Sequence, residues 1–147
     1  VEDTAAGLTI TGSDRASAAA HPAVRRYANE GWDYRGRVSA HEALQLLART
    51  KLVLAPFVDG ITGRRTSAMA ALSVGARVLT STGPLYDPRF AEGVAGVARS
   101  RAEFVEAAMR VWNAADAPES RSSRLRWYRT QLAGAKLDED LLAIVSP

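Results

Sequence analysis

Cysteine is absent from this 147-residue sequence, and histidine occurs only twice, as His21 and His41. Without cysteine the chain can form no disulfide and no thiolate metal site, and it has no cysteine nucleophile. Two histidines are too few for a typical zinc site. We therefore predict that the protein holds no metal.

Long apolar runs are also missing. No stretch approaches the roughly 18 to 20 apolar residues that are needed to span a bilayer. The first residues, Val1, Glu2 and Asp3, lack the basic and apolar regions of a signal peptide. We expect a cytoplasmic protein without stable membrane insertion.

Lysine is scarce too, because Lys51 and Lys136 are the only lysines among 19 basic residues. Arginine suits bidentate contacts with phosphate groups. A GC-rich genome would also favour arginine over lysine throughout, and we prefer this explanation for most of the arginines. The position of an arginine in the fold must therefore decide whether it belongs to a site.

The remaining composition is that of an ordinary globular protein. Hydrophobic residues make up 47% and charged residues 24% of the chain, and the formal net charge is +3. This balance allows a buried core, and the length is usual for one domain. We predict a single domain over residues 1–147.

Short apolar segments alternate with longer helical patterns along the chain. The apolar segments predict strands at residues 7–11, 32–36, 52–56, 77–80 and 93–98. The helical patterns follow after the turn at residues 12–14 through about residue 28, from 39 onward, before the glycine at 75, from 100 onward, and in the tail at about 118–133 and 138–145. Ser39 with Glu42, and Ser100 with Glu103, form capping boxes that open two of these helices.

This order of elements predicts an α/β fold, a Rossmann-like open parallel sheet with helices on both faces. The continuous apolar run from Leu52 to Ala55 is typical of a strand that helices cover on both sides. In such sheets ligands bind beyond the carboxyl ends of the strands. The loops that follow the strands therefore hold the candidate site.

One of these loops combines glycines, arginines and hydroxyl residues. Residues 59–67, with the sequence DGITGRRTS, lie between a predicted buried strand and a predicted helix. A helix N-terminus offers free N–H groups and the positive end of the helix dipole, so an anion is favoured there. Arg64 and Arg65 would add charge-assisted hydrogen bonds, and Thr66 or Ser67 would give a hydroxyl or cap the helix. The composition fits an ordinary surface loop equally well.

The usual nucleotide-binding motifs are absent. The loop lacks the Gly-Lys-Ser/Thr ending of a Walker A motif, and no Gly-x-Gly-x-x-Gly follows the first predicted strand. The sequence therefore does not indicate a standard mononucleotide or dinucleotide site.

Four segments nevertheless form an ordered set. They are residues 8–13 (LTITGS), 34–42 (YRGRVSAHE), 46–56 (LLARTKLVLAP) and 67–80 (SAMAALSVGARVLT). Each segment is weak alone, but their order and spacing resemble the C-terminal, donor-binding domain of GT-B glycosyltransferases of the group 1 type. The resemblance spans most of the chain from Leu8 to Gly83. It implies a nucleoside diphosphate sugar as substrate and an acceptor hydroxyl that receives the glycosyl group, with no cofactor.

The resemblance implies roles for two groups of residues, while catalytic residues stay unknown. The diphosphate would be held by Thr62, Gly63, Arg64, Arg65, Thr66 and Ser67. The nucleobase and the sugar would be contacted by Gly12, Ser13, Arg37, Val38 and Asp59. An acidic residue such as Asp59 also fits a solvated turn.

Two departures from the family pattern bear on these roles. Many retaining members carry two glutamates around this loop and helix, but Ala70 stands at the second position and the first has no clear equivalent. The family domain also begins with a strand, a glycine turn and a helix before the first strand found here. We expect a fragment that lacks this first βα unit and its partner, the N-terminal acceptor domain, and that is inactive in isolation.

Other interpretations remain open. A non-catalytic α/β regulatory or interaction module has the same order of elements, and a degenerate transferase domain fits the missing glutamates. Trp127 and Tyr128 lie among arginines, a composition that also occurs on nucleic-acid surfaces. Their helical spacing favours an aromatic core contact beneath a solvated basic face, so we expect no nucleic-acid partner.

Overall fold

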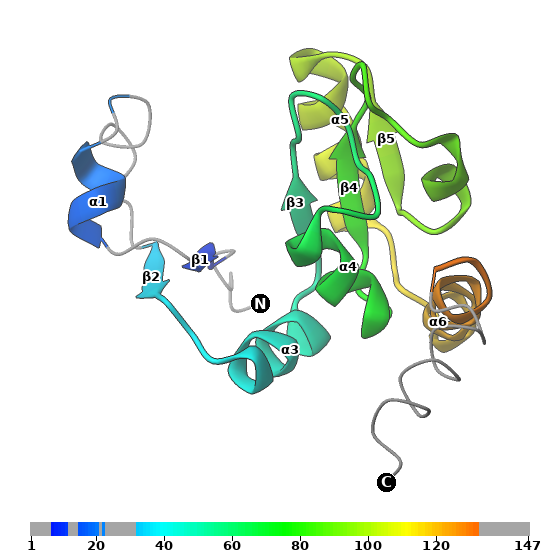
Figure 1. Ribbon diagram of the computed structural model, residues 1–147, viewed down its shortest axis with the longest axis horizontal. Coiled ribbons are helices and arrows are strands. Elements are labelled where there is room, and N and C mark those ends of the chain that lie inside the picture. The colour runs from blue at the N-terminus through cyan, green and yellow to red at the C-terminus, as the bar shows by residue number, and fades with distance from the viewer. Residues whose placement is uncertain (1–6, 12–14, 21, 23–31, 133–147) are drawn as a thin grey trace, which may run out of the picture. The chain divides into compact units, whose positions relative to one another are not determined.

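The computed structural model describes residues 7–11, 15–20, 22 and 32–132 (Figure 1). The chain forms two compact units, residues 1–43 and residues 44–147, called unit 1 and unit 2 below. Each unit carries a small parallel sheet with flanking helices, which confirms the predicted α/β class. One domain over residues 1–147 stays a prediction.

Unit 1 contains a two-stranded parallel sheet. Strand β1 spans Thr9–Thr11 and pairs with β2, Asp33–Gly36, and the register shifts between Ile10 and Thr11. Helix α1 spans Arg15–Ala20, so the beginning of the first predicted helix is confirmed, while its residues 23–28 lie outside the described part of the chain. The Trp32 and Tyr34 rings lie against each other with centroids 6.3 Å apart.

Helix α3, Ala40–Arg49, begins with the predicted serine cap. The Glu42 N–H donates to Ser39 Oγ over 3.2 Å. Leu47 packs against the core of unit 2, whereas Leu44, one turn earlier, is 37% exposed. The apolar face of this helix is therefore buried only in part.

Unit 2 contains a three-stranded parallel sheet in the order β3-β4-β5. Its strands are β3 (Val53–Ala55), β4 (Val78–Ser81) and β5 (Gly96–Ala98). Its helices are α4 (Thr66–Ser73), α5 (Arg101–Asn113) and α6 (Pro118–Gln131), and a short 3-10 helix, η1 (Pro88–Glu92), precedes β5. Helix α4 packs on one face of the sheet with α6 against it, and α5 covers β4 and β5 on the opposite face (Figure 1).

Strand β3 is covered less completely than predicted. Ala55 is buried, but Leu54 is 47% exposed. The reason is that β3 forms one edge of the sheet, while α5 packs against the other two strands. The prediction that helices cover both faces of this strand is wrong at Leu54.

The main core of unit 2 lies between the sheet and helices α4 and α6. Its buried members are Ala55, Ile61, Ala68, Ala71, Leu72, Ala76, Val78, Phe90 and Trp127. The rings of Phe90 and Trp127 meet edge to face with centroids 5.7 Å apart, a geometry that aromatic pairs prefer. Trp127 is thus a core residue, as its helical spacing indicated.

Helix α5 buries small side chains against the sheet. Ala107 and Val111 are buried. Phe104, Ala108 and Trp112 are only half-buried. The fully buried part of this helix is therefore narrow.

Two arginines of α6 hold the end of α4. Gly75 follows that helix with φ +70°, a conformation that favours glycine. Arg121 donates to the Val74 carbonyl and Arg124 to the Gly75 carbonyl, each over 2.9 Å. Arg124 also forms a bidentate pair with Asp116, at 2.9 and 2.7 Å. These cations satisfy carbonyls at the negative end of the helix dipole.

A buried arginine serves the end of α5 in the same way. Arg77, which directly precedes β4, donates to the carbonyls of Val111 and Ala114. The desolvation of its guanidinium is thus offset by bonds to carbonyls that the helix leaves unpaired. The end of α5 is thereby tied to the start of the central strand.

The loops after β3 and β4 touch through their backbones. A Cβ at Gly83 would lie 2.3 Å from the Asp59 carbonyl carbon, and one at Gly60, whose φ is +92°, would lie 2.8 Å from Tyr86. The Leu85 N–H donates to the Asp59 carbonyl over 2.8 Å. The two loops are therefore joined into one layer at the carboxyl edge of the sheet.

We predict that Gly83→Ala destabilises unit 2. The new methyl group would overlap backbone atoms of the loop after β3, and these atoms would have to shift. Overpacking of this kind costs about 1–3 kcal/mol. Gly63→Ala in the same region is the matched control, since a Cβ there meets nothing within 4 Å. Urea unfolding of both variants measures the difference, and equal stability of the two would contradict the backbone contact.

We also predict a pH-dependent effect of Asp116→Asn. Hydrogen bonds from Arg124 lower the pKa of Asp116 below its ordinary value. The stabilisation is therefore present above the unfolded pKa of about 3.9 and is lost as the pH falls through the lower pKa of the folded protein. The variant should lower the free energy of unfolding at neutral pH, on the order of 1 kcal/mol, and this loss should shrink in acid.

The control for this experiment is Glu106→Gln, which removes an exposed carboxylate of α5. Glu106 makes no ion pair within the described residues. Urea unfolding is compared at pH 7 and at about pH 3. An equal loss at both pH values in Asp116→Asn would argue against the contribution of the charged pair.

Candidate functional site

The three strands of unit 2 end at one edge, and the segments that follow them lie together. β3 ends at Ala55, β4 at Ser81 and β5 at Ala98, and all three run in parallel. The next residues of each chain segment form the carboxyl edge of the sheet. This is the edge at which open parallel sheets bind ligands.

The predicted phosphate loop leaves β3 and enters α4 through two tight turns. The Arg65 N–H donates to the Thr62 carbonyl over 3.1 Å, and the Arg64 N–H donates to Thr62 Oγ1 over 3.3 Å. Gly63 is exposed at the tip. Thr62, Gly63, Arg64 and Arg65 thus form the turn that leads into the helix, and their role toward a diphosphate stays a prediction.

The N-terminus of α4 has no side-chain cap. Arg65 occupies the cap position, so Thr66 and Ser67 are the first helical residues and neither caps the helix. The backbone N–H groups of Ser67 and Ala68 have no acceptor among the residues that the structure describes. The first turn also lacks an acidic residue, so its positive end is not neutralised locally.

The two arginines of the loop differ in their surroundings. Arg65 Nη2 lies 2.5 Å from Asp59 Oδ1, and its guanidinium stands over the Phe57 ring, 4.9 Å from the centroid. Arg64 is exposed, and its guanidinium has no ion-pair partner in the described segments. Asp59, which the resemblance assigns to the sugar, is therefore a partner of Arg65 here.

The other residues predicted to contact the nucleobase and sugar belong to unit 1. Gly12 and Ser13 lie outside the described residues. Arg37 is exposed and Val38 is half-buried, directly after β2. The roles of these four residues stay predictions.

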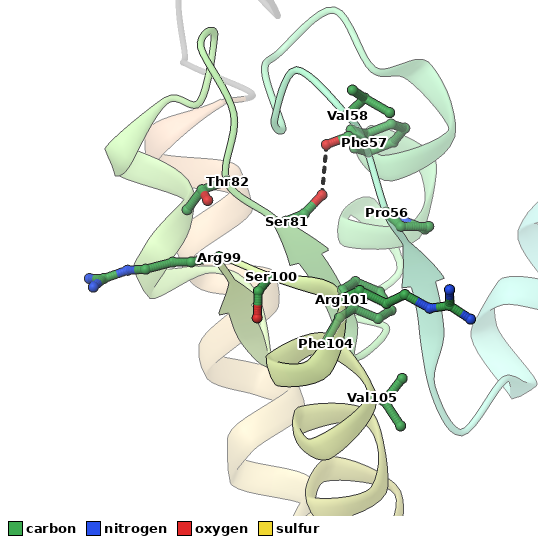
Figure 2. Close-up of a pocket in the computed structure, with 10 residues that line it drawn as sticks. All are labelled: Pro56, Phe57, Val58, Ser81, Thr82, Arg99, Ser100, Arg101, Phe104 and Val105. Atoms are coloured by element: carbon green, nitrogen blue, oxygen red, sulfur yellow. Dashed lines mark hydrogen bonds between the residues drawn. The ribbon is translucent and has the colours of Figure 1, made fainter.

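A pocket of about 420 Å³ opens at the carboxyl edge on the side of α5 (Figure 2). It is lined by Pro56, Phe57, Val58, Ser81, Thr82, Arg99, Ser100, Arg101, Phe104 and Val105. None of the loop residues 62–67 lines it. The sequence did not indicate this pocket, because its lining comes from three loops that are far apart along the chain.

Hydrogen bonds fix the wall of this pocket. Ser81 Oγ donates to the Phe57 carbonyl over 2.6 Å, as the dashed line in Figure 2 shows, and the Thr82 N–H donates to the Ala98 carbonyl over 2.8 Å. These bonds join the segments after β3, β4 and β5 into one surface.

The N-terminus of α5 borders the pocket and is capped. The Glu103 N–H donates to Ser100 Oγ over 3.2 Å, and the Arg99 N–H donates to Glu103 Oε2 over 2.8 Å. The predicted capping box is thus present, with its carboxylate reaching Arg99 rather than Ser100. This end of the helix is neutralised, in contrast to α4.

The turn after β4 is held by its own residues. Asp87 accepts hydrogen bonds from the backbone and the guanidinium of Arg89, and these bonds lower the pKa of Asp87. Burial, with a smaller effect of the Asp87 charge, raises the pKa of Tyr86. The Asp87 side chain thus caps the start of η1.

Comparison with known proteins adds no identification: no protein-family model, no curated protein and no solved structure matches the chain. The resemblance to GT-B glycosyltransferases therefore stays a prediction from the sequence pattern. None of the described helices has both the length and the apolar character of a membrane span. Among the described residues, no three His, Asp or Glu side chains gather as a metal site would require.

Proposed function

We propose that this chain binds a nucleoside diphosphate sugar and contributes that donor site to glycosyl transfer in a larger protein. The observation that carries the proposal is the uncapped start of α4 with Arg64 and Arg65 beside it. Free N–H groups, a helix dipole and guanidiniums together favour a diphosphate. The carboxyl edge of a parallel sheet is also where such ligands bind.

The chemistry of this site would be electrostatic. In glycosyl transfer an acceptor oxygen forms a bond to the anomeric carbon while the bond to the diphosphate oxygen breaks, and negative charge grows on the departing diphosphate. The acceptor hydroxyl loses its proton to a base, which we expect from the N-terminal acceptor domain. Here the amides of Ser67 and Ala68 and the two arginines would stabilise the growing charge.

The ion pair of Arg65 limits one of these contacts. A carboxylate 2.5 Å away competes with any phosphate for the same guanidinium. Arg64, without such a partner among the described residues, is the cation that is free to move to the ligand. In this proposal Arg64 is the main cation that contacts the diphosphate. The guanidinium of Arg65 binds both the diphosphate and the Asp59 carboxylate.

We predict that Arg64→Ala and Arg65→Ala each weaken binding of nucleoside diphosphates several-fold, because each removes a solvent-screened charge-assisted contact worth about 1 kcal/mol. Calorimetry with UDP, GDP, ADP and dTDP, with and without attached sugars, measures the affinities and identifies the base. Arg110→Ala, an exposed arginine near the end of α5, is the matched control. Unchanged affinity in both loop variants would remove this loop from the site.

We predict that Asp59→Asn strengthens binding of the bare diphosphate, since it releases Arg65 from its carboxylate partner. If Asp59 also contacts the sugar, the variant should show no such gain in affinity for the sugar conjugate, because it loses that contact. Calorimetry with the diphosphate and its sugar conjugate separates the two effects. Weaker binding of the bare diphosphate would contradict the competition between Asp59 and phosphate.

Absence of binding to all four diphosphates would favour the rival interpretation, a non-catalytic α/β module. Both interpretations share this architecture, which serves many functions in proteins. The binding experiment therefore tests the proposal at its first step, before any transfer reaction is attempted.

A further inference from the structure

The pocket on the α5 side of the carboxyl edge has charges of one sign. Arg99 and Arg101 are among its lining residues, and no acidic residue is. Neither guanidinium makes an ion pair with any residue that the structure describes. Figure 2 shows the two side chains leaving the backbone in opposite directions, so that they flank Ser100. An anion bound at the rim would therefore not have to compete with a protein carboxylate for Arg99 or Arg101.

The walls of the same pocket are largely apolar. Phe57 and Pro56 come from the segment after β3, and Phe104 and Val105 come from the first turns of α5. Two aromatic side chains and two aliphatic ones can contact a flat or branched hydrocarbon body. A bare inorganic anion would leave these walls unused.

The three hydroxyl groups of the pocket have different roles: two bind backbone carbonyls of the pocket wall, and one can donate to a ligand. Ser81 donates to the Phe57 carbonyl, and Thr82 Oγ1 points to the Ala98 carbonyl at 3.4 Å. Ser100 Oγ accepts the Glu103 N–H, so its own O–H remains able to donate. This leaves one hydroxyl donor between the two arginines.

We propose that this pocket binds a small organic anion, with a phosphate ester or carboxylate group at the Ser100 hydroxyl, in the positive field of Arg99 and Arg101, and an aromatic or aliphatic body against Phe57 and Phe104. The proposal is independent of the donor site, because residues 62–67 do not line the pocket. It also does not depend on the α5 dipole, which Glu103 neutralises. Guanidiniums and apolar walls together define the ligand class.

The test uses the whole 147-residue chain and follows backbone amide signals by NMR while phenyl phosphate is added. Benzyl alcohol, which keeps the ring without the charge, and inorganic phosphate, which keeps the charge without the ring, are the comparison probes. We expect phenyl phosphate to bind at least about tenfold more tightly than either, with shifts at residues 81–82 and 100–101. Equal affinity for phenyl phosphate and inorganic phosphate would overturn the proposed ligand class.

A matched pair of variants on α5 tests the location. Val105 lines the pocket and is 57% exposed, while Met109 does not line it and is 58% exposed. Val105→Glu should weaken phenyl phosphate binding at least about tenfold through charge repulsion, and Met109→Glu should leave it unchanged. Equal effects of the two variants would place the ligand elsewhere.

A milder pair covers the case in which a glutamate disturbs folding. Arg101→Gln should weaken phenyl phosphate binding several-fold, and Arg110→Gln, on the same helix but outside the lining, should not. Shifts confined to residues 62–67 would overturn the pocket proposal and support the donor loop instead. Shifts at residues 81–82 and 100–101 with no diphosphate binding would support the pocket and count against the donor loop.

Discussion

The backbone contact at Gly83 is the constraint on which the carboxyl edge of unit 2 depends. No side chain fits between this residue and the Asp59–Gly60 backbone, so the loops after β3 and β4 are held as one piece. Both candidate sites use that piece. Phe57 is one of the residues that line the pocket, and its ring lies under the guanidinium of Arg65. A change in the loop contact would therefore disturb the ligand surfaces on both faces of the sheet.

The arginines of unit 2 divide by position into two kinds. Arg77 and Arg124 reach helix C-termini and donate to carbonyls that the helices leave unpaired. Arg64, Arg99 and Arg101 stand at the carboxyl edge and have no ion-pair partner among the described residues. Composition gives no means of separating these groups. Only their place in the fold distinguishes a structural cation from one that is free for a ligand.

The order of strands and helices could be predicted because period and capping are local properties of the sequence. Ser100 caps its helix as predicted, and Trp127 packs in the core as its spacing indicated. The exposure of Leu54 could not be predicted, since it depends on which strand lies at the sheet edge. The same holds for the pairing of Asp59 with Arg65 and for the pocket on the α5 side. Both depend on the tertiary arrangement of the loops, which local sequence patterns do not encode.

The two helix N-termini at this edge have different electrostatic character, and that difference separates the two proposed ligands. α4 begins without a side-chain cap or an acidic residue, so backbone amides remain for an anion. α5 begins with a serine cap and a glutamate that accepts the Arg99 N–H, so its amides contribute less. A ligand dominated by phosphate charge should therefore prefer α4. A ligand that adds apolar surface gains contacts only beside α5, where Phe57 and Phe104 supply them.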